Sequence, residues 1–175
     1  MTDEAQEAKG FAVRKTHEDD WPLVRAFRIE NATDNPISYG ATLQTTLAMT
    51  EDDWRVRARR GQENNATALV AIDVASERWI GMMSAQDGDE DGTEPVLTGV
   101  YVTPDYRGRQ HGVADALLGH IVAWAGLRAA HLRLYVHEDA TPARRFYTRH
   151  GFTATGRVRP HPFASGQQLE LIRRL

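Results

Sequence analysis

The sequence predicts a single domain of mixed α/β architecture, in which helices cover a β-sheet. A chain of 175 residues is ample for one domain with a substantial core and short for two. Its 41% hydrophobic and 26% charged residues are typical of a globular protein. Strand-like and helix-like segments follow one another in the order β-α-α-β-β-β-α-β-α-β-β, which favours a layered fold.

The first sixty residues predict one strand followed by helices. Thr16 with Asp19, and Thr50 ahead of three acidic residues, are capping signals at helix starts, and Gly61 is typical of a helix end. The expected elements are a strand at 11–15, a helix from about 16 to 31, a loop at 34–40, a short helix at 42–49 and a further helix at 50–61.

The middle of the chain predicts three strands, with an acidic loop before the third. We expect strands at 66–73, 79–86 and 96–102, and the loop at 87–94. Aspartates alternate in this loop as they do in calcium-binding loops. An EF-hand also needs a Glu at its twelfth position and flanking helices, and both are missing. We therefore predict a solvated loop and no metal site.

The last third predicts two helices and three strands. An apolar stripe that ends in Ala125 and Leu127 indicates a long amphipathic helix. Pro142 in the first turn, with Thr141 or Asp139 near the cap, begins the second helix. The expected elements are helices at 112–130 and 141–150 and strands at 131–136, 152–158 and 168–173.

Composition narrows the class of protein. A net charge of −3 argues against general nucleic-acid binding, and a chain without cysteine forms neither a disulfide nor a thiolate metal site. No apolar run approaches the roughly 18 residues of a membrane-spanning helix. Residues 1–9 lack the apolar core of a signal peptide, so we expect a flexible tail before one domain at 10–175. These features predict a cytoplasmic protein without a nucleic-acid or membrane partner.

The most informative stretch begins at Val100. An apolar strand stops at Pro104, a basic loop containing Gly108 follows, and a helix begins at Gly112. Backbone N–H groups at a helix start lack intrahelical partners and lie at the positive end of the helix dipole, where phosphate binds well. The segment predicts a pyrophosphate site. The alternative is an ordinary strand-to-helix connection with surface arginines.

A second cluster predicts a short helix that is followed by Gly-Phe. Its residues are Ala143-Arg144-Arg145-Phe146-Tyr147-Thr148-Arg149-His150-Gly151-Phe152. Together the two clusters resemble the GCN5-related N-acetyltransferase (GNAT) family over residues 11–175. The family's acyl-CoA signature matches Arg109-Gln110-His111-Gly112-Val113-Ala114, and its A-x-x-[LF]-Y-x-x-x-G-F block matches the second cluster. Arg107-Gly108 offers another register for the signature. It would put Gln110 where a small residue is wanted, so we favour Arg109.

The resemblance implies a mostly antiparallel sheet with flanking helices, in which the central strands at 96–102 and 131–136 splay apart. It also implies acetyl-CoA as cosubstrate, with the pyrophosphate on backbone amides and the pantetheine along the strand edge. A backbone group at Val100 or Val102 would polarise the thioester carbonyl. The implied cofactor-binding residues are Val100, Tyr101, Val102, Arg107, Arg109, Gln110, His111, Gly112, Val113, Ala114 and Tyr147.

The resemblance implies that Tyr147 is the general acid. A phenol stays protonated at neutral pH and can donate to a departing thiolate; the alternative is a packing aromatic. Ala140 stands where many members carry an Asn that contacts the cofactor. No residue stands out as the general base. Glu94, ahead of the central strand, is the catalytic candidate we carry forward, and His137 and Glu30 are the others.

We therefore expect an N-acetyltransferase that acts on a primary amine of a small molecule or an exposed peptide. The resemblance also allows a homodimer, since dimers are common in this family. Two alternatives remain open. One is a non-catalytic acyl-CoA-binding module. The other is a nucleotide-phosphate binder, which is disfavoured because no Gly-Lys-Ser/Thr follows the loop.

Overall fold

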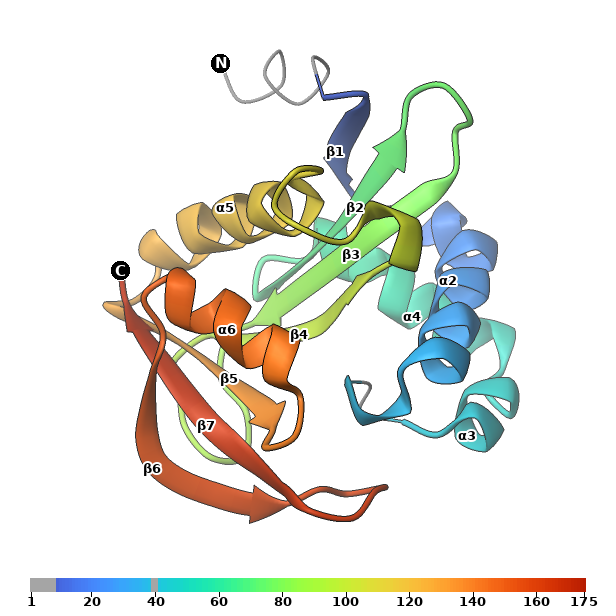
Figure 1. Cartoon of the computed structure of the whole chain (residues 1–175). Coiled ribbons are helices and arrows are strands. Elements are labelled where there is room, and N and C mark those ends of the chain that lie inside the picture. Colours follow the sequence, from blue (N-terminus) through green and yellow to red (C-terminus); the bar gives the residue numbers. More distant parts are fainter. Residues whose placement is uncertain (1–8, 39–40) are drawn as a thin grey trace.

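A single twisted sheet with helices on both faces makes up the fold (Figure 1). The structure is a computed structural model and describes residues 9–38 and 41–175. In this part of the chain seven strands follow the spatial order β1-β2-β3-β4-β5-β7-β6. The strands are β1 (Phe11–Lys15), β2 (Ala66–Asp73), β3 (Trp79–Gln86), β4 (Val96–Val102), β5 (His131–His137), β6 (Thr153–Pro160) and β7 (Gln167–Arg174).

Helices occupy most of the remaining chain. The α-helices are α2 (Trp21–Asp34), α3 (Leu43–Leu47), α4 (Glu51–Arg59), α5 (Val113–Gly126) and α6 (Thr141–Arg149); the 3-10 helices are η1 (Glu18–Asp20), η2 (Pro36–Ser38), η3 (Arg60–Gln62) and η4 (Pro104–Tyr106). Three α-helices separate β1 from β2, matching the three helical segments predicted there, although the predicted order of elements counted only two. No helix in the described residues has both the length and the apolar character needed to cross a membrane.

Each face of the sheet has its own apolar core. On one face α5 buries Val113, Leu117 and Ile121 against the strands. On the other face Phe27 of α2 and Trp54 of α4 belong to a separate cluster with residues of β2, β3 and β4. The central strands are therefore covered on both sides.

Two predicted helix boundaries were wrong. Thr16 does not cap a helix; it is fully buried and its hydroxyl donates to the carbonyl of Ala58 at 2.7 Å, while His17 precedes η1. The long helix ends at Gly126, and Leu127 is 87% exposed instead of continuing the apolar stripe. Thr50 does cap α4, since its hydroxyl accepts from the Asp53 amide.

Two aspartates of the acidic loop at 87–94 pair with basic and phenolic side chains of neighbouring strands. Asp89 lies 2.8 Å from the guanidinium of Arg133, which is 4% exposed and therefore needs a counter-charge. Asp91 accepts from the Tyr135 hydroxyl at 2.6 Å and pairs with Arg159 at 3.1 Å. Residues 87–94 are all exposed or half-buried, as expected of a solvated loop. The pairing of the loop with basic and phenolic groups on the neighbouring strands was not predicted.

The centre of the sheet is irregular in two ways. β4 pairs with β3 antiparallel, but the register shifts between Met82 and Ser84, opposite Gly99. Gly99 has φ of +60°, the left-handed conformation of a glycine-containing bulge. β4 then pairs with β5 in parallel at one position, Val96 with Arg133, and the ends beyond separate. The expected mostly antiparallel sheet with splayed central strands is confirmed.

Candidate active site

The separation of β4 from β5 opens a cavity, which we call the splay cavity, of about 400 Å³. Its walls come from Val100 and Val102 of β4, from the loop after that strand and from α6, which contributes Phe146 and Tyr147. A strand edge that no neighbouring strand covers presents backbone groups to a ligand. Arg107 Nε already donates to the Val102 carbonyl at 2.9 Å. Of the predicted backbone contacts, those of Val100 are therefore the better placed for a ligand.

The loop between β4 and α5 has two left-handed glycines. Gly108 has φ of +103° and Gly112, the N-cap of α5, has φ of +70°. The amides of His111 and Gly112 donate to the Gly108 carbonyl at 3.2 and 3.4 Å, so they close the loop on itself. The N–H groups of the first turn of α5, residues 113–115, have no intrahelical acceptor and point out of the helix start. These are the donors that the geometry offers to an anion.

The two arginines of the loop point to different partners. Arg107 reaches back to Asp34 at the end of α2, and its guanidinium lies over the Tyr101 ring at 5.5 Å. Arg109 lines a surface groove beside the start of α5 and α6. Lys9, which the sequence assigned to the tail, brings its ammonium to 2.8 Å from where a Cβ on Gly112 would lie. Positive charge therefore lies near the helix start from Arg109 and from Lys9.

Tyr147 lies deep between the strands and α6. It is 6% exposed, packs edge-on against Phe146 and Phe152, and lines the splay cavity. Burial raises the pKa of Tyr147 far above its usual range. The hydroxyl is therefore a permanent hydrogen-bond donor at any physiological pH. Ala140, just before α6, lines the same cavity and offers no side-chain hydrogen bond.

The candidate bases lie apart from Tyr147 or already have partners. Glu94 precedes β4 at the closed end of the splay and lies 3.0 Å from His131 Nδ1; the far end of β4 is about 20 Å away by strand rise. Glu30 pairs with Arg78 at 3.1 Å. The Nδ1 atom of His137 accepts from the Asp139 amide, and its Nε2 atom bonds to the Ser165 carbonyl.

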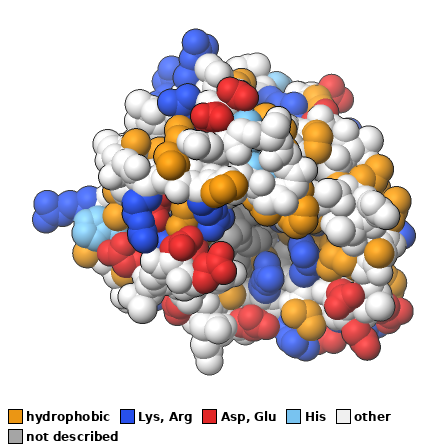
Figure 2. Space-filling view, turned by 90° about the horizontal axis from the view of Figure 1, so that it is seen from below, with side chains coloured by type: hydrophobic (Ala, Val, Ile, Leu, Met, Phe, Trp, Pro, Cys, Tyr) orange, Lys and Arg blue, Asp and Glu red, His pale blue; other side chains and the backbone are white. Residues whose placement is uncertain are grey.

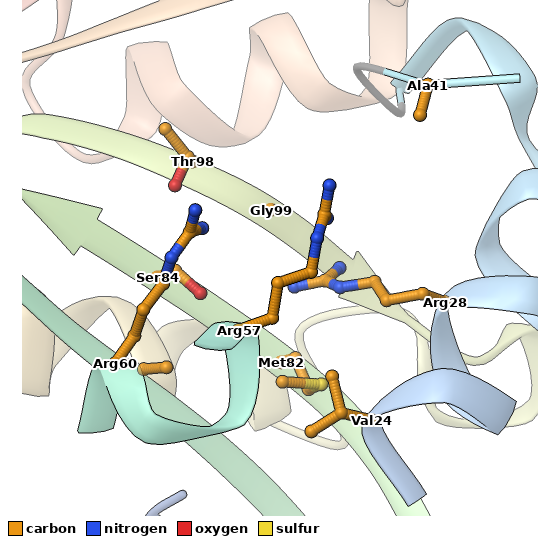
Figure 3. A pocket seen from close by; sticks show the side chains of 10 residues that line it. Val24, Arg28, Ala41, Arg57, Arg60, Met82, Ser84, Thr98 and Gly99 are labelled. Atoms are coloured by element: carbon orange, nitrogen blue, oxygen red, sulfur yellow. The ribbon is translucent and has the colours of Figure 1, made fainter. Parts of the chain in front are cut away.

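Two smaller cavities continue the splay cavity past β4. The connecting cavity, of about 100 Å³, shares Val100, Ala140 and Tyr147 with the splay cavity. It shares Thr98 and Gly99 with a third space of about 160 Å³, the arginine cavity, which Arg28, Arg57 and Arg60 line together (Figure 3). Sequence analysis missed this last cavity. The only sequence signal for this cavity was the run of arginines at 55–60, which has no glycine-containing, phosphate-binding loop beside it.

Comparison with known proteins agrees with this fold. Residues 27–152 match the model of the Acetyltransferase (GNAT) family, and the chain belongs to that family. The chain is 37% identical over 107 residues to a mycothiol acetyltransferase of Actinosynnema mirum, a match that takes in 61% of this chain and 34% of that protein. The chain thus spans about a third of the length of this curated relative.

Solved structures show the same fold across the chain. A GCN5-related N-acetyltransferase from Kribbella flavida superposes with a TM-score of 0.74 at 21% identity, over 96% of this chain and 99% of that one. Arabidopsis thaliana NAA60 in complex with acetyl-CoA superposes with a TM-score of 0.69 at 17% identity, over 94% and 98% of the two chains.

Proposed function

We propose that this chain is an acetyl-CoA-dependent N-acetyltransferase that acetylates a primary amine of a small molecule or an exposed peptide. The observation that carries the proposal is the continuity of the site. The splay cavity has Gly108 and Ala114, at the start of α5, in its wall, and the buried Tyr147 lines the same cavity. Family membership and the acetyl-CoA complex of NAA60 support the choice of cosubstrate.

The coenzyme would lie along this path. Its diphosphate would take the N–H groups at residues 113–115, with Arg109 and Lys9 beside them, which supports the Arg109 register of the signature. Its pantetheine would follow the uncovered edge of β4. A backbone group of Val100 would then hydrogen-bond the thioester carbonyl and stabilise the oxyanion that develops there.

The reaction itself needs one group to stabilise the leaving sulfur. The amine nitrogen attacks the carbonyl carbon, the carbon–sulfur bond breaks, and the electron pair stays on sulfur. A phenol whose pKa lies far above that of a thiol, about 8.5, does not give up its proton fully. Tyr147 would therefore donate a hydrogen bond to the thiolate, and the proton released by the amine would protonate the sulfur or pass to water. This geometry supports Tyr147 as a catalytic residue more strongly than Glu94.

The test is release of free thiol from acetyl-CoA in the presence of a panel of amines, amino acids, aminoglycosides and peptides, with Tyr147→Phe as the variant. Loss of a donor that acts on the leaving group is expected to lower kcat by about 100-fold or more, while the affinity for acetyl-CoA stays close to the parent value. Equal losses in kcat and affinity would indicate a packing role. Binding of acetyl-CoA without transfer to any amine would indicate the non-catalytic module instead.

A further inference from the structure

The arginine cavity is placed where an acceptor would lie. It opens on the α2 and α4 side of β4, with Thr98 and Gly99 in its wall. These two residues also line the connecting cavity, which reaches Tyr147 from the other side. A molecule in the arginine cavity could therefore extend an amine past Gly99 to a thioester held near Val100. At about 160 Å³ the cavity has the size of one that accommodates a single small ring.

Three guanidinium groups from different elements converge on this cavity (Figure 3). Arg28 comes from α2, Arg57 from α4, and Arg60 from the 3-10 turn that follows α4. Arg28 is 5% exposed, and a Cβ built on Gly99 would lie 2.6 Å from its Nη2 atom. The guanidinium of Arg57 lies 5.6 Å from the centre of the Trp54 ring, which helps to fix its position.

The charge in this cavity is of one sign. The polar groups that accompany the arginines are the hydroxyls of Ser84 and Thr98, and no acidic side chain lines the cavity in the part of the chain that the structure describes. Each of these arginines also has an interaction within the protein, which restricts where its guanidinium group lies. The face shown in Figure 2 carries acidic and basic side chains interspersed.

An anion held among three guanidinium groups is attracted to all of them. Guanidinium groups match the oxygen geometry of carboxylate and phosphate, and a buried arginine is the usual choice for such a contact. The same positive charge disfavours a cationic ammonium. A bound amine is therefore shifted toward the neutral form that attacks the thioester, without a carboxylate base beside it.

We propose that the acceptor is a small amine that carries its own carboxylate or phosphate, and that Arg28, Arg57 and Arg60 bind this anionic group. This inference rests on the proposed function and names the substrate class of the same site. The amine would extend toward Gly99, and the anionic group would lie among the guanidinium groups. Amines of the same size that lack an anionic group are poor acceptors on this account.

The test compares acceptors that differ only in the anionic group. The pairs are β-alanine against β-alaninamide for a carboxylate, and phosphoethanolamine against ethanolamine for a phosphate. Binding is measured by calorimetry in the presence of coenzyme A, and kcat/KM by thiol release from acetyl-CoA. The anionic member of at least one pair is expected to bind at least tenfold more tightly and to have a kcat/KM at least tenfold higher. The pair that shows the preference tells carboxylate from phosphate.

Variants then assign the preference to the cavity. Arg57→Gln and Arg60→Gln are expected to remove at least tenfold of the anion preference and to leave acetyl-CoA affinity unchanged. Arg55→Gln is the matched control, because Arg55 lies on the same helix, outside the cavity, and pairs with Glu51 at 2.8 Å. It should keep the preference.

The outcomes separate the two proposals. Equal affinities within both pairs, or a preference that survives Arg57→Gln and Arg60→Gln, would overturn the anionic-acceptor inference. If the anionic-acceptor inference fails in this way but acetyl groups are still transferred efficiently to β-alaninamide or ethanolamine, the acetyltransferase proposal stays intact. If no amine is acetylated, the acetyltransferase proposal fails, and the binding comparison still decides whether the cavity prefers an anion.

Discussion

The left-handed glycine at the start of α5 gives a sharp test of the diphosphate site. A side chain at φ of +70° costs about 1–2 kcal/mol of folding free energy, so Gly112→Glu should lower the melting temperature by about 2–8 °C. Its carboxylate would also lie near the bound diphosphate. Two unit charges about 6 Å apart at an effective dielectric constant of about 20 repel by roughly 3 kcal/mol. We expect acetyl-CoA affinity to fall about 100-fold.

Isothermal titration calorimetry with acetyl-CoA measures this loss, and two variants separate its causes. Gly112→Ala introduces the backbone strain without the charge, so it should show the same thermal loss with a much smaller change in affinity. Gly119→Glu places the same charge about two turns along α5, at an exposed position where a Cβ meets nothing within 4 Å. It should bind normally. Parent affinity in Gly112→Glu, or an equal loss in Gly119→Glu, would refute the assignment of the diphosphate to this helix start.

Three further predictions concern stability and the acceptor side. Arg133→Met removes the buried cation that pairs with Glu170 at 3.5 Å, while Arg157 stays within 3.7 Å of that carboxylate, so urea unfolding should show a loss of about 1.5–3 kcal/mol. Burial acts to raise the pKa of Asp115, but hydrogen bonds from His150 and Arg149 outweigh it and lower that pKa. The ionised carboxylate therefore stabilises the fold above the unfolded-state pKa of about 3.9. This stabilisation is lost as the pH falls through the lower pKa of the folded state. Thermal unfolding between pH 7 and 3 should show a shallower acid loss in Asp115→Asn than in the parent. Gly99→Ala should raise the KM for the acceptor more than the Kd for acetyl-CoA in steady-state and calorimetric assays, because its Cβ displaces Arg28.

Local signals predicted the strands well. Strands at 66–73, 79–86 and 96–102 are confirmed at the predicted residues, because apolar and β-branched runs there end at clear turn residues. Helix ends were less predictable. The hydroxyl of Thr16 could either cap a helix or hydrogen-bond to a carbonyl far away in the sequence. It donates to the carbonyl of Ala58, because tertiary packing brings the two residues together. Sequence spacing alone carries no information about that partner.

Contacts between distant segments could not be predicted from local patterns. The pairing of the acidic loop was not predicted because its counter-charges, Arg133 and Arg159, lie more than 40 residues away in the chain. The arginine cavity was missed for the same reason. Arg57 and Arg60 belong to one run, but Arg28 joins them only because α2 and α4 pack on the same face of the sheet.

The middle of β4 shows how these features connect. Thr98 and Gly99 lie in the middle of this central strand, and neither has an ionisable side chain that could act as a base. In the structure Gly99 forms the bulge, and its missing side chain makes room for the Arg28 guanidinium. A side chain at this position would separate the arginine cavity from the connecting cavity that leads to Tyr147. On the proposed binding mode the arginines therefore stand where a base was expected: their positive charge disfavours a protonated amine, and they bind the acceptor through its anionic group.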